Sequence, residues 1–235
     1  MTKVYTIGVS GPSCSGKTTL SQILFSILPN CVVICQDEFF KPDNQIPIDQ
    51  TTGLANWDCP DAIDFKALTR TISHVRTNNG QLPEWYQSKA IKNDHDKRQI
   101  LPRQVTQQLD PWLKHIQPDI MFLIVEGFML YQDKDLSNEI DRKIFITASY
   151  EMLKTRRETR TGYATKLGTW VDPLGYFDDI VWPQYVKWNK QFFVDDSCSI
   201  VRQDVAHSML VLNTDVSSIE QTSSKALDYL QTQFK

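Results

Sequence analysis

The stretch that decides the fold runs from Gly11 to Thr18 and reads GPSCSGKT, which fits the pattern G-x-x-x-x-G-K-[ST]. The two glycines let the chain wrap so that backbone N–H groups point at the oxygens of a bound phosphate. Lys17 supplies a positive charge at the β- and γ-phosphates of a nucleotide, and the Thr18 hydroxyl can bind Mg²⁺. The predicted ATP-binding residues of this segment are Gly11, Ser13, Cys14, Ser15, Gly16, Lys17, Thr18 and Thr19.

The residues on both sides give this loop the setting that a nucleotide-binding loop requires. Residues 4–10 form a short apolar run that is typical of a β-strand. From Lys17 onward, apolar residues recur at the i, i+3 and i+4 spacing of a helix, which Pro29 ends. The positive end of such a helix also attracts phosphate. This order of elements indicates nucleoside triphosphate binding and does not identify a second substrate.

Further apolar runs indicate more strands, and stretches of helical spacing indicate helices. The expected strands are residues 32–34, 120–125, 144–146 and 209–212. One helix is expected to begin at Pro60, with Ile63, Leu68, Ile72 and Val75 facing the core; another carries Met152, Leu153, Arg156, Arg157 and Arg160; a third spans residues 219–230. Such alternation predicts a doubly wound α/β fold with a parallel sheet of about five strands, whose ligands bind beyond the carboxyl ends of the strands.

We expect one domain over residues 1–235, because the sequence has no internal repeat and no low-complexity linker. Residues 78–104 are polar, mixed in charge and weakly periodic, which is typical of an irregular surface excursion. Residues 155–175 combine arginines and aromatic residues with Gly and Pro, as a mobile lid over a binding site would.

The composition limits what the chain binds and where it works. Its 25 basic and 28 acidic residues give a net charge of −3, which argues against a broad basic face for nucleic acid. No run of about 18 apolar residues could span a membrane, and the first residues lack the pattern of a signal peptide. The 5 cysteines show no metal-ligand spacing, which favours a reduced intracellular protein, cytoplasmic without excluding the nucleus. The composition thus favours neither nucleic acid nor a membrane as partner, and the oligomeric state is not predicted.

Acidic residues follow two strands at the edge where phosphate chemistry would occur. Glu126 ends the central strand and could reach a metal ion or orient its waters; the alternative is an acid that caps a strand at a solvent-exposed edge. Asp37 follows the second strand and could take the proton of an acceptor hydroxyl. Glu38 is the competing base, but neighbouring residues on an extended segment point to opposite sides, so only one faces the site. For either residue the alternative is a surface acid.

Trp57, Asp58 and a group of arginines are the candidates for holding a second substrate. The Trp57 ring could stack on a planar ring while Asp58 accepts two sugar hydroxyls; alternatively, Trp57 packs in the core and Asp58 caps a helix. The cluster of Arg156, Arg157 and Arg160 suggests a lid that clamps phosphates, or else a solvated basic face.

Several short segments of the chain together match one known family. In chain order they are IGVSG with the P-loop (from residue 7), LPNC (28–31), QDEFFKP (36–42), WD (57–58), VEGF (125–128), RRETR (156–160), GYFD (175–178) and VWP (181–183). The chain thereby resembles the nicotinamide riboside kinases, within the uridine-kinase-like group of P-loop small-molecule kinases. The combination of QDEFFKP with GYFD and VWP is much more specific than the P-loop, which many families share.

The resemblance implies an ATP- and Mg²⁺-dependent kinase that phosphorylates the 5′-hydroxyl of nicotinamide riboside, and of nicotinic acid riboside, in NAD synthesis. It implies Asp37 as the catalytic base beside Lys17, and Glu126 near the metal ion with Thr18. Arg156 and Arg160 would bind ATP. Asp58 and Arg157 would bind the ribose hydroxyls, and aromatic residues would sandwich the pyridine ring. The implied substrate-binding residues are Asp37, Phe40, Trp57, Asp58, Arg157, Tyr163 and Asp172.

The chain departs from the family pattern at the acceptor side. Family members carry Tyr where this chain has Trp57, which still supplies a flat face. The segment between Arg160 and Asp172 is longer than in the family, so either Tyr163 or Trp170 can be the second aromatic partner. Residues 78–104 have no counterpart in the family pattern.

Two other functions compete with this interpretation. A uridine or cytidine kinase of the same fold is the alternative enzyme, but a pyrimidine needs hydrogen bonds to its base edge, whereas a pyridine carboxamide mainly needs stacking. The aromatic-rich loops favour the pyridine. A nucleotide-dependent binding module without an acceptor is the other alternative, and it would have no use for a carboxylate at Asp37 or for the pair Trp57 and Asp58.

Overall fold

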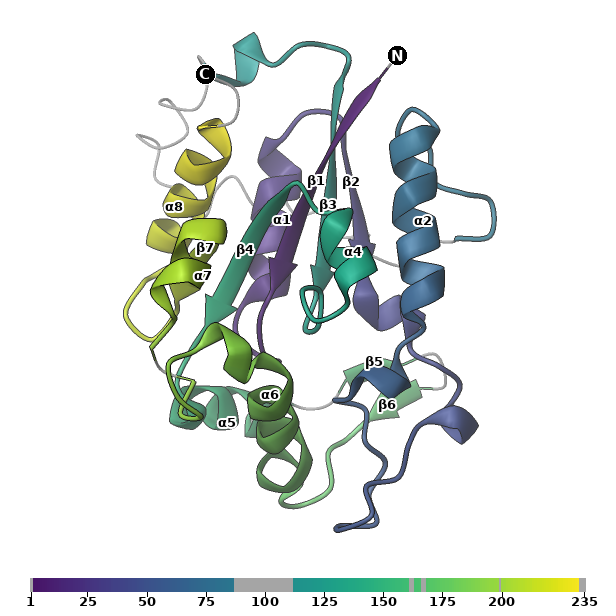
Figure 1. The fold of residues 1–235 in the computed structure, drawn as a ribbon, viewed down its shortest axis with the longest axis vertical. Coiled ribbons are helices and arrows are strands. Elements are labelled where there is room, and N and C mark those ends of the chain that lie inside the picture. The colour runs from purple at the N-terminus through teal and green to yellow at the C-terminus, as the bar shows by residue number, and fades with distance from the viewer. Residues whose placement is uncertain (1, 87–111, 161–162, 166–167, 199, 233–235) are drawn as a thin grey trace.

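The computed structural model describes residues 2–86, 112–160, 163–165, 168–198 and 200–232. Within these residues the main sheet has 5 parallel strands in the order β2-β3-β1-β4-β7. The strands are β1 (Lys3–Ser10), β2 (Cys31–Cys35), β3 (Ile120–Gly127), β4 (Arg142–Thr147) and β7 (Leu210–Asn213). The predicted doubly wound parallel sheet is confirmed, with every expected strand in place (Figure 1).

Helices cover both faces of this sheet (Figure 1). They include α1 (Lys17–Ile27), α2 (Phe65–Thr77), α4 (Lys134–Asn138), α5 (Tyr150–Glu158), α6 (Trp182–Asn189), α7 (Gln203–Ser208) and α8 (Ile219–Gln231). The strand predicted to be central, β3, is an interior strand between β2 and β1, and β1 is the middle one. β3 shows the two layers: Phe122 and Ile124 pack with α1 and α8, whereas Leu123 and Val125 pack with α2, α4 and α6. A strand buried on both faces has apolar residues at every position, which is why its sequence is a continuous apolar run.

The predicted lid region contains a small hairpin. Strands β5 (Tyr163–Thr165) and β6 (Gly168–Trp170) pair antiparallel after α5, and the π-helical turn Phe177–Val181 then leads into α6. In the predicted excursion, residues 78–86 form turns and irregular chain, and the Tyr86 ring stacks on Phe39 with centroids 5.6 Å apart. Residues 87–104 lie outside the described residues. No helix in the described ranges has the length and apolar character to cross a membrane.

The helix predicted to start at Pro60 starts later. Pro60–Ala62 forms a short 3₁₀ turn, and Ile63 then adopts an extended conformation and bridges to Phe40. α2 begins at Phe65, where the Asp64 carboxylate accepts a hydrogen bond from the backbone N–H of Ala67 at 2.9 Å. The prediction was wrong because Pro suits a 3₁₀ turn as well as a first helical residue, and the strand-like bridge at Ile63 separates the turn from the helix. The four predicted core residues Ile63, Leu68, Ile72 and Val75 are buried.

The helix that was predicted to carry three arginines ends before the third. α5 stops at Glu158, and Thr159 is its C-cap. The backbone N–H of Arg160 bonds to the carbonyl of Arg157 at 3.1 Å, an i→i−3 contact that tightens the chain past the helix end. Arg160 therefore does not share a helical face with Arg156 and Arg157.

Tyr131 links the neighbouring strands β1 and β4 through its hydroxyl. Its buried hydroxyl donates to the carbonyl of Gly8 at 2.8 Å or to that of Ile144 at 2.9 Å, and it accepts from the N–H of Ile144 at 3.0 Å. The Tyr131 hydroxyl thus contacts backbone groups of both β1 and β4.

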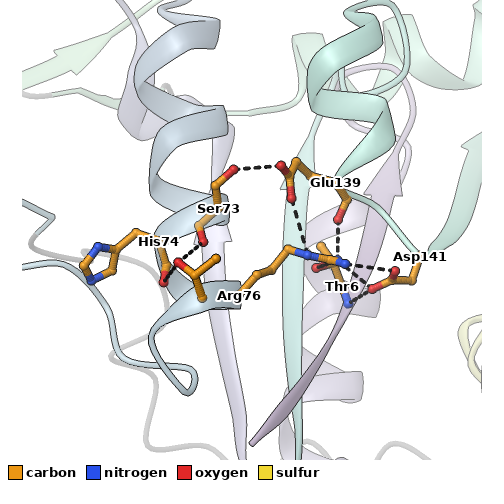
Figure 2. A network of polar contacts seen from close by, with 7 residues as sticks. Thr6, Ser73, His74, Arg76, Glu139 and Asp141 are labelled. Atoms are coloured by element: carbon orange, nitrogen blue, oxygen red, sulfur yellow. Dashed lines mark hydrogen bonds and ion pairs between the residues drawn. The ribbon is translucent and has the colours of Figure 1, made fainter. Parts of the chain in front are cut away.

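A second polar contact group joins α2 to the strands near their amino ends. The Arg76 guanidinium donates to the Thr6 hydroxyl at 2.8 Å, to the Glu139 carbonyl at 2.8 Å and to the Asp141 carboxylate at 2.7 Å. Figure 2 shows Arg76 reaching between Glu139 and Asp141, with Ser73 bonding to Glu139 from the preceding turn of the same helix at 2.7 Å. The network holds α2, β1 and the start of β4 in a fixed relation, away from the carboxyl ends of the strands.

Candidate functional site

The P-loop, residues 11–18, lies between β1 and α1 and has the backbone of a phosphate-binding loop. Gly11 has a φ of +145°, and a Cβ there would lie 2.1 Å from the carbonyl oxygen of Ile146. Gly16 has a φ of +101° and precedes α1 as its N-cap. Both positions therefore require glycine, Gly11 for space as well as conformation and Gly16 for conformation. Ser15 and Lys17 are buried, Ser13, Cys14 and Gly16 are half-buried, and Thr18 and Thr19 are exposed.

Lys17 is held inside the loop. Its Nζ donates to the carbonyl of Pro12 at 2.8 Å. Burial lowers the pKa of Lys17, and the nearby carboxylates of Glu126 and Asp37 oppose that shift. The ammonium group is thus positioned on the loop before any ligand arrives, and it shares its surroundings with two acids.

Glu126 contacts the P-loop through a side-chain hydrogen bond. The hydroxyl of Thr18 donates to Oε1 of Glu126, which lies at the end of β3 and is buried. Burial raises the pKa of Glu126, while the Thr18 hydrogen bond and the Lys17 charge lower it. The alternative, an acid at a solvent-exposed strand edge, does not fit a buried carboxylate that is bonded to the P-loop.

Asp37 lies at the same edge, but not on an extended segment. Residues Gln36–Phe39 form a 3₁₀ helix, so the argument that neighbouring side chains alternate does not apply there. The segment is anchored by the buried Gln36, whose amide bonds to the backbone N–H and carbonyl of Met129 at 3.0 and 3.2 Å. This anchor lets the 3₁₀ turn present Asp37 outward, whereas Glu38 is half-buried.

The surroundings of Asp37 are those of a recessed surface group. Its side chain is exposed to solvent, yet desolvation by the surrounding protein is the largest influence on it and raises its pKa. The positive charges of Lys17, Arg160 and Arg157 act in the opposite direction. A carboxylate that is open to solvent, partly desolvated and faced by three cations is suited to accept a proton from a molecule bound next to it.

Trp57 and Asp58 lie on the loop between β2 and α2, beside Phe40. The rings of Phe40 and Trp57 meet edge to face with centroids 5.3 Å apart, and Phe40 also stacks on Phe128 at 5.9 Å. Asp58 does not cap α2, because Asp64 does, so the capping part of the alternative is excluded. Trp57 is half-buried and packs against a small cluster that includes Leu153 and Tyr176.

Charged groups on several other segments influence the pKa of Asp58. Desolvation raises the pKa of Asp58 to about 6. The positive charge of Arg157 lowers it, the carboxylates of Asp172 and Asp37 raise it, and Lys17 lowers it slightly. Five charged groups from five separate segments therefore influence one another at this edge of the sheet.

The three arginines separate into three different environments. Arg156 donates to the carbonyl of Cys14 at 3.4 Å and to the hydroxyl and carbonyl of Thr214 at 3.0 and 3.2 Å, so it joins the P-loop to the loop after β7. Arg160 is exposed and lies 4.0 Å from the sulfur of Cys14. Both arginines therefore lie against the P-loop, and their role in ATP binding stays a prediction.

Arg157 is buried and has a protein carboxylate as its partner. Its Nε donates to Oδ2 of Asp172 at 2.6 Å and its terminal nitrogen to Oδ1 at 3.1 Å, a two-point contact of the kind that fixes a guanidinium in orientation. Both Asp172 oxygens are thus engaged with Arg157. The sequence predicted that anions would meet these arginines, and for Arg157 the chain itself supplies one.

The last predicted aromatic residues belong to the hairpin. Tyr163 of β5 and Trp170 of β6 are directly paired positions of the two strands. The structure places both at the open end of the same hairpin and does not decide between them as a ring partner, so this assignment stays a prediction.

Sequence reasoning missed two residues that shape the site. Thr214, which contacts Arg156 and Ser15, follows β7 directly, and the rule that ligands lie beyond the carboxyl ends of strands could have pointed to it. Tyr176 lies in the GYFD segment, which contributes to the family resemblance, but the sequence assigns no role to this tyrosine. Its hydroxyl bonds to the backbone beside Trp57.

Comparisons with known proteins agree with this geometry. Residues 6–161 match the phosphoribulokinase/uridine kinase family. The chain is 35% identical over 194 residues to nicotinamide riboside kinase of Schizosaccharomyces pombe, covering 82% of each chain. It is 34% identical to nicotinamide riboside kinase of Saccharomyces cerevisiae, covering 82% of this chain and 80% of the relative. Nicotinamide riboside kinase 1 of Homo sapiens is 33% identical, over 80% of this chain and 78% of the relative.

The family match includes the P-loop as well as Asp37 and Asp58. It covers the P-loop, the end of β3 and the start of the lid region, and a P-loop kinase family implies ATP as phosphate donor and a small molecule as acceptor. The chain therefore belongs to the phosphoribulokinase/uridine kinase family and, within it, to the nicotinamide riboside kinases.

Proposed function

We propose that this protein transfers the γ-phosphate of ATP to the 5′-hydroxyl of nicotinamide riboside, and likewise of nicotinic acid riboside, to give the mononucleotide. The observation that carries the proposal is the meeting of two carboxylates from separate loops, Asp37 and Asp58, with Lys17 of the P-loop. Desolvation raises the pKa of both acids; the positive charge of Lys17 opposes this rise, and the charge of Asp37 adds to the rise at Asp58. Asp37, influenced by Lys17, suits the reacting hydroxyl of an acceptor. Asp58, influenced by Arg157, suits the binding of its other hydroxyls.

The P-loop supplies the donor side. Its backbone N–H groups and Lys17 hold the β- and γ-phosphates, and the positive end of α1 adds to the field. The hydroxyl of Ser15 is buried and has no hydrogen-bond partner among the described residues, and a phosphate oxygen would satisfy it. Arg156 and Arg160, both against the P-loop, are the further cations on this side.

Thr18 and Glu126 fit a magnesium ion. They bring a hydroxyl and a buried carboxylate oxygen into contact at the start of α1. Mg²⁺ prefers oxygen ligands, takes few of them from the protein and completes its shell with phosphates and water. When bound, the ion neutralises negative charge on the β- and γ-phosphate oxygens.

Asp37 acts as the base. It accepts the proton of the 5′-hydroxyl as that oxygen bonds to the γ-phosphorus, while the bond from the γ-phosphorus to the bridging oxygen breaks and ADP leaves in line. The raised pKa of Asp37 makes it a better proton acceptor than an ordinary surface aspartate, and Lys17 keeps it ionised before transfer.

Asp58 and Trp57 hold the nucleoside. The Asp58 carboxylate accepts hydrogen bonds from the ribose hydroxyls, and Arg157, whose orientation Asp172 fixes, donates to the hydroxyl oxygens. Trp57 and Phe40 offer aromatic surface for the pyridine ring, and Tyr163 and Trp170 are the candidates for its opposite face.

A uridine or cytidine kinase is the second candidate, because the family matched by residues 6–161 includes uridine kinases in its name. The test is a coupled assay of ADP formation with nicotinamide riboside, nicotinic acid riboside, uridine, cytidine or no acceptor. We expect turnover with the two pyridine nucleosides; turnover with pyrimidine nucleosides alone supports the second candidate, and equal turnover without any acceptor contradicts both.

The same assay tests the base. Asp37→Asn should lower kcat by about 10²–10⁴-fold, the usual contribution of a positioned general base. Glu38→Gln is the matched control and should stay within about twofold of the wild type, because an acid that takes no proton contributes little to the barrier. Equal loss in both variants, or normal kcat in Asp37→Asn, would remove Asp37 from this role.

A further inference from the structure

Tyr176 joins two parts of the nucleoside site that are far apart in the sequence. It lies directly after Gly175, whose φ is +81°, and before the π-helical turn Phe177–Val181. Its side chain is among the largest that the protein buries completely. The hydroxyl of a buried tyrosine usually has hydrogen-bond partners.

The Tyr176 hydroxyl forms hydrogen bonds with the backbone on both sides of Asn56. It donates to the carbonyl of Ala55 at 2.8 Å and accepts from the N–H of Trp57 at 3.3 Å. Burial raises the pKa of this hydroxyl, so it stays protonated and able to donate at any physiological pH. One hydroxyl therefore fixes the short segment that carries Trp57 and Asp58.

The ring of Tyr176 lies close to the guanidinium of Arg157. The Arg157 guanidinium carbon lies 5.7 Å from the Tyr176 ring centroid, within the range of a cation–π contact. Arg157 is also held by both oxygens of Asp172. Tyr176 thus lies between Arg157 and the Trp57 segment, with its ring toward one and its hydroxyl on the other.

We propose that Tyr176 is a positioning residue that sets the distance between Asp58 and Arg157, and so the width of the ribose subsite. This inference rests on the proposed function, since it assigns the acceptor pocket to Asp58 and Arg157. Tyr176 acts through these residues and touches no reacting atom. Its hydroxyl therefore matters for nucleoside binding and not for phosphate transfer.

The test is Tyr176→Phe, which keeps the ring and its packing and removes the two backbone hydrogen bonds. We expect the KM for the nucleoside to rise about tenfold, the effect of one lost buried hydrogen bond on a ligand contact. The kcat at saturating nucleoside and the KM for ATP should stay within about twofold, because the removed interaction holds the acceptor equally in ground and transition states.

Tyr131→Phe is the matched control. It also removes a buried tyrosine hydroxyl that bonds to backbone groups, in this case of Gly8 and Ile144 in the sheet. It should lower the melting temperature by a similar amount and leave the KM for the nucleoside unchanged. If both variants raise this KM equally, the effect is one of general stability and the positioning role of Tyr176 is excluded.

Two further measurements separate positioning from structure. In an Asp58→Ala background, Tyr176→Phe should raise the KM by less than about twofold, because residues that act through one another are not additive. Hydrogen exchange of the backbone amide of Trp57 should be about tenfold faster in Tyr176→Phe than in the wild type and unchanged in Tyr131→Phe.

The outcomes distinguish this inference from the proposed function. If the wild type phosphorylates no nucleoside, the proposed function is wrong, and the exchange rate at Trp57 then decides whether Tyr176 holds that segment. If the wild type is active but the KM effect of Tyr176→Phe persists in full without Asp58, or the exchange rate at Trp57 does not change, Tyr176 is not a positioning residue.

Discussion

At the scale of single residues, the acids at the strand edge are held in places where their ionised forms are costly. Asp58 is half-buried and Glu126 is buried, and desolvation is the largest influence on the pKa of each. Asp37 remains open to solvent but is also desolvated by its surroundings. Carboxylates that are kept in such positions cost stability at neutral pH, and sites that bind or transform ligands commonly carry this cost.

The ionisation of Asp58 makes the free energy of unfolding depend on pH in a way that can be measured. Its folded-state pKa of about 6 lies above the usual value of 3.8, so its ionisation destabilises the fold as the pH rises through this interval. Asp58→Asn should therefore be more stable than the wild type at pH 8, by no more than about 3 kcal/mol from a shift of about two pH units. Near pH 4 the difference should vanish.

Thermal unfolding of the two proteins across this pH range checks the prediction. Asp61→Asn, an exposed neighbour in the same loop, is the control and should change the melting temperature little at any pH. A difference between Asp58→Asn and the wild type that does not shrink toward pH 4 would contradict the assignment of the raised pKa to Asp58.

At the scale of elements, side chains from one segment fix the backbone of another. Tyr131 joins β1 to β4, Tyr176 joins the turn before α6 to the loop before α2, and Gln36 joins the 3₁₀ turn to Met129. Arg76 does the same for α2 at the amino ends of the strands. Each contact joins polar groups of two segments, so the loss of one partner removes a hydrogen bond from the other.

The Arg76 network predicts a loss of stability without a loss of function. Arg76→Met keeps much of the apolar stem but removes the bonds to Thr6, Glu139 and Asp141, and should cost about 1–3 kcal/mol in the free energy of unfolding. The measurement is chemical denaturation.

Arg202→Met is the matched control, because Arg202 pairs with Asp204 on the exposed surface, and it should cost less than about 1 kcal/mol. The KM values of both variants should equal those of the wild type. Equal stability losses in the two variants would show that the network contributes no more than a surface ion pair.

At the scale of the whole molecule, the sheet brings together groups from both ends of the chain. The P-loop follows β1, Glu126 is the penultimate residue of β3, and Thr214 follows β7, so all three lie at the carboxyl edge of the same parallel sheet. A ligand bound there touches several elements at once. Binding should therefore stabilise the fold as a unit and not only one loop.

Thermal shift with nucleotide tests this expectation. ATP with Mg²⁺ at about 100 times its dissociation constant should add about 2.7 kcal/mol, which raises the melting temperature of a chain of this size by about 5–10 °C. Glu126→Gln should keep the shift caused by ATP alone and lose the further shift caused by Mg²⁺.

Glu158→Gln, at the exposed end of α5, is the control and should retain both shifts. A full Mg²⁺-dependent shift in Glu126→Gln would place the metal ion away from this carboxylate.

Local sequence determined the features that depend on spacing along the chain. The P-loop follows from two glycines and a lysine at fixed positions, and the strands and α1 follow from runs and periods of apolar residues. These features have a local physical cause, since glycine permits the turn and periodicity sets the buried face. The error at Pro60 has the same origin, because a proline favours a 3₁₀ turn and a helix start alike.

Tertiary structure alone decided which side chains meet. No spacing in the sequence shows that Arg157 is satisfied by Asp172, that Arg156 reaches Thr214, or that the Tyr176 hydroxyl holds the backbone of Ala55 and Trp57, 121 and 119 residues away. The reason is that such contacts depend on the order of strands in the sheet and on the path of the loops between them. The P-loop that opens the chain thus fixes the phosphate site, while the fold assembles the acceptor side around it.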